Sequence, residues 1–335
     1  MRRKHRVMVW LLSLCLILGS AVRARAGGKI SMAVEFVDHA AAAHIALKKG
    51  WFKEKGLQVG SFDNYITGIA LAAALSHKGI DVAYMCLCPA ILAYANGHVP
   101  LKVVCGTHKG GYGCLVDPKK VRKPADLFEA GIRIGCPREG SASDVFMNRF
   151  IEVHHFNRED FLKQVRRMPP PNILMAMKLG RLDAGFLPEQ FPTMGESMGF
   201  KRLCDALDVW PGMQGSGVVV REDLLEHHPD AVRDIVDVTR KGIDVINSHP
   251  GEASAIVSAA LQAEGSRIFP VKMTSLLKVF QVTPKVIESS LTRHMRCDVG
   301  VDPVMVQKII DFMARLGYIR PFKAEAILDL RWIHD

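Results

Sequence analysis

The sequence lacks several patterns, and each absence counts against a class of function. After its first 26 residues it has no apolar run long enough to cross a membrane. It has no Cys-x2-Cys and no paired-histidine spacing, so we expect no structural zinc site, no other resident metal and no cofactor. Its basic residues form no continuous stripe, and we therefore expect no nucleic-acid partner.

A phosphate-binding loop is also absent. Gly135 and Gly140 have the glycine spacing of such a loop, but Ser141 stands where the loop requires lysine. The sequence therefore predicts no nucleotide site at this otherwise suitable turn.

The first residues, in contrast, carry a recognisable signal. Four Lys or Arg residues precede an uncharged run from Val7 to Val22, and Ala24-Arg25-Ala26 has the A-x-A pattern of a cleavage site. We expect residues 1–26 to be a cleaved signal peptide and the protein to be periplasmic. A retained N-terminal anchor is the alternative, although the apolar run is short for a membrane span.

Cleavage would change the apparent charge of the chain. The leader holds six of the 44 Lys and Arg residues and none of the 34 acidic residues, so the formal charge of +10 would fall to +4. The remaining 309 residues suffice for two domains of ordinary size. Seven cysteines would remain, an odd number, so at least one is a free thiol or pairs with another molecule.

Short apolar strands alternate with helical patterns in two successive units. The first unit occupies about residues 29–105, and the second begins near Val116. This alternation predicts an α/β fold in which helices cover the faces of mostly parallel sheets. From Arg221 onward the pattern is almost entirely helical, and we expect these helices to pack over the first unit.

The stretch 132–150 predicts a strand, a turn and a helix that could hold a ligand. Ser141 precedes Asp144 by three residues, as in a capping box, which makes Ser141 the N-cap. Free N–H groups at the start of a helix favour negative charge. We therefore expect Gly140, Ser141, Ala142 and Ser143 to contact a ligand. The alternative is a plain cap, with the hydroxyl used by its own helix.

Other polar residues stand where predicted strands end. Asp38 and His39 follow the first strand and could hydrogen-bond a ligand, or Asp38 could simply cap a helix. Thr67 is a ligand candidate or an N-cap, and Tyr65 offers a flat stacking surface. Glu189 ends a later strand, where it could bind a cationic group or steady a hinge. All five are candidate ligand-binding residues, because ligands bind beyond the carboxyl ends of parallel strands.

The cysteines allow several interpretations. Cys86 and Cys88 lie two residues apart, so in an extended strand both thiols face one side, towards a cleft. With Cys136 they could bind a soft metal or thiophilic ligand. The simpler hypothesis is that they are small buried hydrophobic residues. Cys105 and Cys114 flank a bend and could form a disulfide.

Short motifs recur in a fixed order along nearly all of the chain beyond the leader. They lie at residues 49–57, 79–83, 89–91, 95–97, 140–141, 182–184 and 221–229. In this order and spacing the sequence resembles the periplasmic substrate-binding proteins of ABC importers. The branch it resembles includes sulfonate, taurine, nitrate and thiamin-pyrimidine binders.

The resemblance implies a type II-like periplasmic-binding-protein fold, in which two α/β lobes joined by two hinge strands close over a ligand. Residues 27–114 and 221–335 would form lobe 1 and residues 115–220 lobe 2, with crossings near residues 113–116 and 217–220. The protein would be a monomer without enzymatic activity that delivers a small molecule to an ABC permease in the inner membrane. The resemblance leaves the ligand open.

Two alternatives to transport remain at this stage. Relatives that synthesise the thiamin pyrimidine carry a dense cysteine motif before the return strand, but the corresponding region here has only Cys204. The other alternative is a binding protein that feeds a sensor, which the sequence does not distinguish from a transport component.

Overall fold

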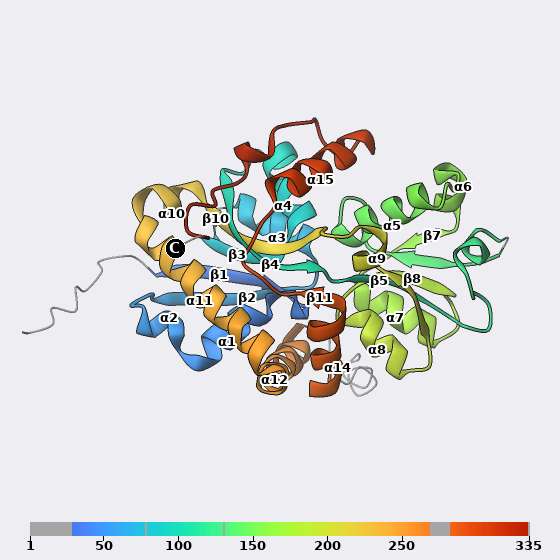
Figure 1. The fold of residues 1–335 in the computed structure, drawn as a ribbon, viewed down its shortest axis with the longest axis horizontal. Helices are drawn as coiled ribbons and strands as arrows, with labels where there is room; N and C mark the ends of the chain where they lie inside the picture. Colours follow the sequence, from blue (N-terminus) through green and yellow to red (C-terminus); the bar gives the residue numbers. More distant parts are fainter. Residues whose placement is uncertain (1–28, 78, 130, 269–281, 334–335) are drawn as a thin grey trace, which may run out of the picture.

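The computed structural model describes residues 29–77, 79–129, 131–268 and 282–333. The predicted signal peptide and a predicted helix at residues 273–280 lie outside this part of the chain. Two β-sheets follow one another along the long axis of the molecule, and helices cover their faces (Figure 1). The predicted α/β class is therefore correct.

The first sheet has six strands in the order β11-β4-β10-β3-β1-β2. Strands β3, β1 and β2, at one side of the sheet, run parallel, whereas β10 runs antiparallel to both β3 and β4. The sheet is therefore mixed rather than purely parallel. The strands are β1 (Ile30–Glu35), β2 (Val59–Tyr65), β3 (Val82–Cys86), β4 (Leu101–Gly110), β10 (Gln214–Arg221) and β11 (Met295–Arg296).

Helices from both ends of the chain cover the first sheet. As predicted, the C-terminal helices return to it, and α11 packs on α1 (Figure 1). These helices are α1 (Ala41–Lys49), α2 (Trp51–Glu54), α3 (Gly68–Ser76), α4 (Leu87–Gly97), α10 (Glu222–His227), α11 (Pro229–Ser248), α12 (Pro250–Ile268), α14 (Pro284–Ser289) and α15 (Pro303–Arg315), with short turns η1 (Asp38–Ala40), η4 (Ser290–His294) and η5 (Ala324–Ala326).

The second sheet has five strands in the order β7-β6-β8-β5-β9, and β5 runs antiparallel to both of its neighbours. The strands are β5 (Tyr112–Val116), β6 (Ile134–Cys136), β7 (Val165–Arg167), β8 (Ala184–Pro188) and β9 (Lys201–Asp205). The helices are η2 (Pro124–Phe128), α5 (Ala142–Val153), α6 (Arg158–Lys163), α7 (Pro170–Lys178), α8 (Phe191–Ser197) and α9 (Ala206–Val209).

The chain enters the second sheet through two glycines. Gly110 and Gly111 both adopt positive φ angles, +74° and +82°, which side-chain-bearing residues rarely adopt. A Cβ atom at Gly111 would also lie 2.7 Å from the His108 ring and 3.0 Å from the His39 ring. The crossing therefore requires glycine at both positions for the backbone conformation, and at Gly111 also because a side chain would collide with the two histidine rings.

The chain returns to the first sheet earlier than expected. Strand β10 begins at Gln214, and Val218 already pairs with Tyr84 of β3 and Cys105 of β4. The return therefore precedes the predicted crossing at residues 217–220. Whether each sheet and its helices form one lobe that moves as a unit remains a proposal.

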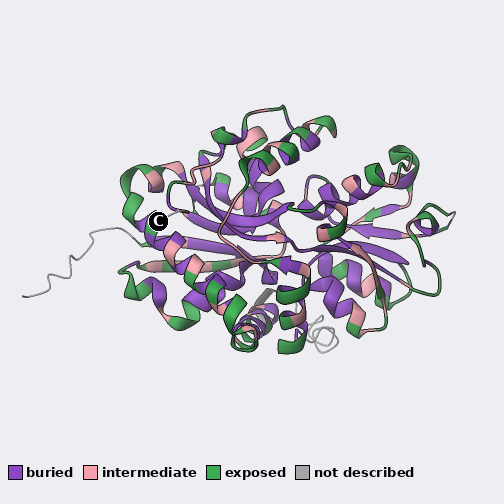
Figure 2. Cartoon of the chain, in the orientation of Figure 1, coloured by how far each residue is buried: buried purple, intermediate pink, exposed green. Residues whose placement is uncertain are grey.

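Apolar side chains alternate between the two faces of the first sheet. Along β1, Met32 and Val34 join one buried apolar cluster, whereas Ala33 joins the other. Each cluster also includes residues of the second sheet, such as Leu187 in one and Phe186 in the other. Figure 2 shows both sheets buried beneath outer helices with exposed faces. Among the described residues, no helix is long and apolar enough to cross a membrane.

Candidate functional site

Buried polar side chains gather where the two sheets meet. Asp38 and His39 form the turn directly after β1, His108 lies near the end of β4, and Glu189 and Gln190 follow β8. Each of these side chains is at most 4% exposed. We call these five residues the interface cluster. Two of its predicted members, Asp38 and Glu189, therefore come together from different sheets.

One hydrogen bond of the cluster joins the sheets directly. The backbone N–H of Asp38 donates to the side-chain oxygen of Gln190, with an N···O distance of 2.9 Å. The two residues are 152 positions apart in the sequence. The position of Asp38 is therefore tied to the second sheet.

The surroundings of His39 assign its tautomer. Nε2 lies 3.0 Å from the carbonyl oxygen of Gly111, which can only accept, so Nε2 carries the hydrogen. Nδ1 is then the acceptor, and it faces Cys86 Sγ at 3.5 Å and Ser216 Oγ at 3.4 Å. Burial lowers the pKa of His39 to about 4, so the ring is neutral at physiological pH.

Several polar atoms of the cluster have no hydrogen-bond partner among the described residues. They include both carboxyl oxygens of Asp38, both ring nitrogens of His108 and the amide nitrogen of Gln190. The hydroxyl of Ser290, in η4, lies next to the Asp38 carboxyl and hydrogen-bonds to its charged form. Buried polar groups almost always have partners, and an unsatisfied one costs about 1–3 kcal/mol. The cluster thus offers donors and acceptors that a bound molecule could satisfy.

The charge state of Asp38 follows from its burial. Desolvation raises the pKa of Asp38 well above its usual value, and the nearby Glu189 carboxylate raises it further. The Ser290 hydroxyl lowers this pKa by a smaller amount. The ligand-free cluster therefore favours a protonated, neutral Asp38. Burial also lowers the pKa of His108 well below its usual range, so this ring too is neutral.

The carboxylate of Glu189 is paired with side chains of its own sheet and the helix next to it. Arg202 Nη1 lies 2.6 Å from one carboxylate oxygen, and the Thr193 hydroxyl donates to the other at 2.7 Å. Burial alone would raise the pKa of Glu189, but Arg202, His294 and Thr193 outweigh it and lower the pKa. Glu189 therefore supplies a fixed negative charge beside Asp38. Its pairing within the second sheet agrees with the structural role that was the alternative to ligand binding.

Glu35 is a buried carboxyl at this edge of the sheet that the sequence did not single out. Burial raises its pKa to about 7, although Cys86 lowers it through two hydrogen bonds. The backbone N–H of Cys86 donates to Oε1 at 2.6 Å, and its thiol donates to Oε2 at 3.2 Å. The position of a carboxyl within an otherwise apolar strand could have indicated that Glu35 belongs to the site. His108, Gln190 and Ser290 were likewise not predicted.

The cysteines do not converge as a three-thiol site. Strand β3 ends at Cys86 and helix α4 begins at Leu87, so Cys86 and Cys88 do not share a strand face. Cys88 and Cys136 instead lie near the Asp144 carboxylate, which adds to the effect of burial in raising both pKa values. Among the described residues, no three His, Cys, Asp or Glu side chains are arranged to hold a metal. The described part of the chain thus does not bring the three thiols together in the way that the soft-metal alternative requires.

The predicted bridge between Cys105 and Cys114 is also wrong. Cys105 lies in β4 of the first sheet, opposite Val218, whereas Cys114 lies in β5 of the second sheet. The seven cysteines of the described chain are all thiols.

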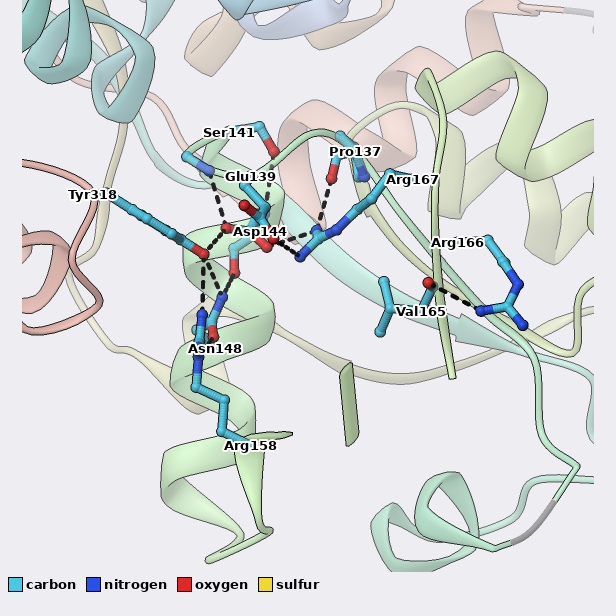
Figure 3. Close-up of polar contacts among 11 residues, drawn as sticks. Pro137, Glu139, Ser141, Asp144, Asn148, Arg158, Val165, Arg166, Arg167 and Tyr318 are labelled. Atoms are coloured by element: carbon cyan, nitrogen blue, oxygen red, sulfur yellow. Dashed lines mark hydrogen bonds and ion pairs between the residues drawn. The ribbon is translucent and has the colours of Figure 1, made fainter. Parts of the chain in front are cut away.

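Figure 3 shows the start of α5, the other predicted ligand contact. Ser141 is the N-cap, as predicted, and its hydroxyl accepts from the N–H of Asp144 at 3.3 Å. The Asp144 carboxylate accepts from the Gly140 N–H and the Tyr318 hydroxyl, and it pairs with Arg167 at 2.6 Å. The chain's own carboxylate thus occupies the helix N-terminus where an anion was expected.

The remaining predicted contacts are placed but not tested by a ligand. Ala142 and Ser143 are buried in the first turn of α5, and the start of that helix faces Leu92 of α4. Thr67 caps α3 by accepting from Ala70 N at 3.2 Å, and Tyr65 packs half-buried against an apolar cluster. Ligand contact at these residues, and at Cys86 and Cys88, stays a prediction.

Comparisons with known proteins relate the chain to one family. The profile of the NMT1-like family matches residues 28–263. A search of curated proteins gives no match.

Solved structures establish the fold. The ligand-binding component of an ABC-type import system from Staphylococcus aureus, solved with zinc bound, superposes with a TM-score of 0.73 at 17% identity, covering 92% of this chain and 99% of that one. The alkanesulfonate-binding protein SsuA from Xanthomonas axonopodis pv. citri, bound to MOPS, gives 0.72 at 14% identity, with 91% and 99% covered. The periplasmic nitrate-binding protein NrtA from Synechocystis PCC 6803 gives 0.70 at 14% identity, with 90% and 86% covered. The fold is that of periplasmic binding proteins.

Proposed function

Because this chain belongs to the NMT1-like family, we propose that it is the solute-binding component of an ABC-type import system outside the cytoplasm. It captures a small molecule between its two sheets and delivers it to a membrane permease. The similarity to import components and to sulfonate and nitrate binders supports this role. The predicted signal peptide supports the same location.

One observation carries the proposal most directly. Asp38 is fully buried where the sheets meet, and apart from the neighbouring Ser290 hydroxyl its carboxyl oxygens have no partner within the described chain. Burial without compensation destabilises the ligand-free protein, so the carboxyl is retained at a cost. A ligand that satisfies Asp38 while both sheets touch it would hold the sheets together.

The charges around Asp38 favour a small organic cation with N–H donors. An anion placed there would face the Asp38 carboxyl and the Glu189 carboxylate. Arg202, the nearby guanidinium of the second sheet, is already paired with Glu189 and Glu196. An amine or amidine group, in contrast, would donate to Asp38 and allow it to ionise. The ligand class we propose therefore differs from that of the sulfonate and nitrate binders.

The thiol at the site supports binding rather than covalent catalysis. Cys86 faces His39 and Glu35, but burial and the Glu35 carboxyl raise its pKa well above the usual value. A protonated thiol is a weak nucleophile.

A thermal-shift screen of residues 27–335 tests the proposal. The panel combines small organic cations, including agmatine, acetamidine and 4-aminopyridine, with the anions ethanesulfonate and nitrate. We expect stabilisation by a member of the cationic group that disappears in Asp38→Asn. Stabilisation by ethanesulfonate or nitrate that Asp38→Asn leaves intact would contradict the proposed ligand class. Turnover of a substrate would contradict the binding role.

A further inference from the structure

Two cysteines face each other across neighbouring strands of the second sheet. Cys114 of β5 and Cys204 of β9 are directly opposite residues in an antiparallel pair. Side chains of directly opposite residues lie on the same face of a sheet. Both cysteines are thiols in this structure.

Their backbone geometry suits a covalent link. In antiparallel pairs, opposite Cα atoms lie about 4.5 or 5.5 Å apart, depending on the hydrogen-bonding pattern. Disulfides span Cα distances of about 4.4–6.8 Å, so either pattern falls within the required range. The register shifts only after this pair, between Cys114 and Leu115, so the bond would form between two residues that are already paired.

The environment of Cys114 identifies Cys204 as its neighbour. Burial raises the pKa of Cys114 well above its usual value, and the adjacent thiol of Cys204 raises it more than Cys136 does. Cys136 lies on β6, and β8 separates that strand from β5. Its thiol is next to Arg167 and Asp144 instead.

The two thiols differ in access to solvent. Cys114 is completely buried, whereas Cys204 is partly exposed. An oxidant in solution would therefore reach Cys204 first. Cys114 would then act as the buried second thiol that completes the bond.

We propose that Cys114 and Cys204 are a modification site that forms a cross-strand disulfide under oxidising conditions. With glutathione disulfide as the oxidant, the Cys204 thiolate attacks one sulfur and releases one glutathione, leaving a mixed disulfide. The Cys114 thiol, held next to the mixed disulfide, loses its proton as it attacks the Cys204 sulfur and releases the second glutathione. Two protons leave the protein thiols, and the two electrons reduce glutathione disulfide to two thiols.

The bond would join the two strands nearest the crossings between the sheets. Strand β5 begins just after Gly111, and β9 ends at Asp205, shortly before the chain returns to the first sheet through α9. The disulfide would close a loop from residue 114 to residue 204 and link the first and last strands of the second sheet in chain order, which are neighbours at one edge of it. Long closed loops restrict the unfolded chain strongly. This property is separate from the proposed ligand role.

Thiol mapping tests the proposal. Residues 27–335 are incubated with glutathione disulfide, free thiols are blocked with N-ethylmaleimide, and the digest is analysed by mass spectrometry. We expect one cross-linked peptide pair containing Cys114 and Cys204, two fewer blocked thiols, and a melting temperature higher by about 5 °C that dithiothreitol reverses. Cys297→Ser, at another partly exposed cysteine, should leave the cross-link unchanged, whereas Cys204→Ser should abolish it.

Refolding from urea in a glutathione redox buffer removes limited access as an explanation for a negative result. If Cys114 and Cys204 both remain blocked by N-ethylmaleimide after refolding, the proposal is wrong. A cross-link between Cys114 and any other cysteine would also overturn it.

Discussion

The backbone N–H of Asp38 donates to the side-chain oxygen of Gln190 across the junction of the two sheets, at 2.9 Å. The same Asp38 has a fully buried carboxyl whose one neighbouring donor among the residues described here is the Ser290 hydroxyl. The residue that contacts the opposite sheet thus also carries a buried carboxyl that the proposed ligand would satisfy. Binding and closure would therefore depend on one position.

We expect Asp38→Asn to stabilise the ligand-free protein increasingly as the pH rises. The folded pKa of Asp38 lies well above the unfolded value of about 3.9, so folding favours the protonated form. Wild type therefore loses stability as the pH rises from the unfolded pKa through the folded pKa. Asparagine does not titrate and avoids this loss. Melting temperatures of both proteins between pH 4 and pH 8 measure the difference.

The matched control is Asp63→Asn, which changes an exposed carboxyl on β2. Its melting curve should follow wild type at every pH. A constant offset between Asp38→Asn and wild type across this range would show that the Asp38 carboxyl does not titrate as its burial requires.

Gln190→Ala should favour the open arrangement of the sheets. The variant removes the acceptor for the Asp38 N–H, and a single hydrogen bond contributes about 0.5–1.5 kcal/mol. We expect up to a tenfold loss of ligand affinity and a larger radius of gyration in small-angle X-ray scattering. Gln58→Ala, at an exposed position, is the control. An unchanged affinity and radius in Gln190→Ala would mean that this bond does not favour closure.

Arg202→Met should destabilise the fold strongly. Glu189 is completely buried, and without Arg202 its charge would lack its main partner. Breaking one side of a buried ion pair typically costs about 3–5 kcal/mol. Urea unfolding would measure the loss, with the exposed Arg181→Met as the control.

The double variant Glu189→Gln with Arg202→Met separates the charge effect from packing. We expect it to recover much of the stability that Arg202→Met loses, because no uncompensated carboxylate remains. Equal losses in the single and double variants would attribute the effect to packing of the Arg202 side chain instead.

Glu35→Gln should stabilise the protein at alkaline pH. Burial raises the pKa of Glu35 to about 7, whereas its unfolded pKa is about 4.3. Wild type therefore loses stability as the pH rises between these values, and the full loss of roughly 4 kcal/mol applies above pH 7. The gain in Glu35→Gln should be small at pH 4.5 and largest at pH 8. Exposed Glu226→Gln should show no such trend, and a pH-independent gain in Glu35→Gln would refute this assignment.

Local sequence patterns predicted the helices and strands and those site residues that directly follow a strand. The alternating units, the Ser141 cap and the position of Asp38 after a strand all depend on neighbours in sequence. The hydrogen bond between Asp38 and Gln190 could not be predicted, because it forms only when two segments that are distant in sequence meet. The pairing of Cys86 with Cys88 failed because the helix begins one residue after Cys86.

Charge was the hardest feature to predict. The start of α5 was expected to favour an anion, but Asp144 folds back to fill that position. The pattern Ser-x-x-Asp indicated the cap without revealing that Arg167 and Tyr318 would hold the same carboxylate. Both come from segments distant in sequence.

Isothermal titration calorimetry of proton release tests the central claim most directly. The cation that stabilises residues 27–335 most in the thermal-shift screen is titrated at pH 6 into wild type and Asp38→Asn, in two buffers of different ionisation enthalpy. Because burial keeps Asp38 protonated until a cation binds, we predict net proton release in wild type and at least a hundredfold weaker binding in Asp38→Asn. Equal affinity in both proteins, without proton release, would contradict the account.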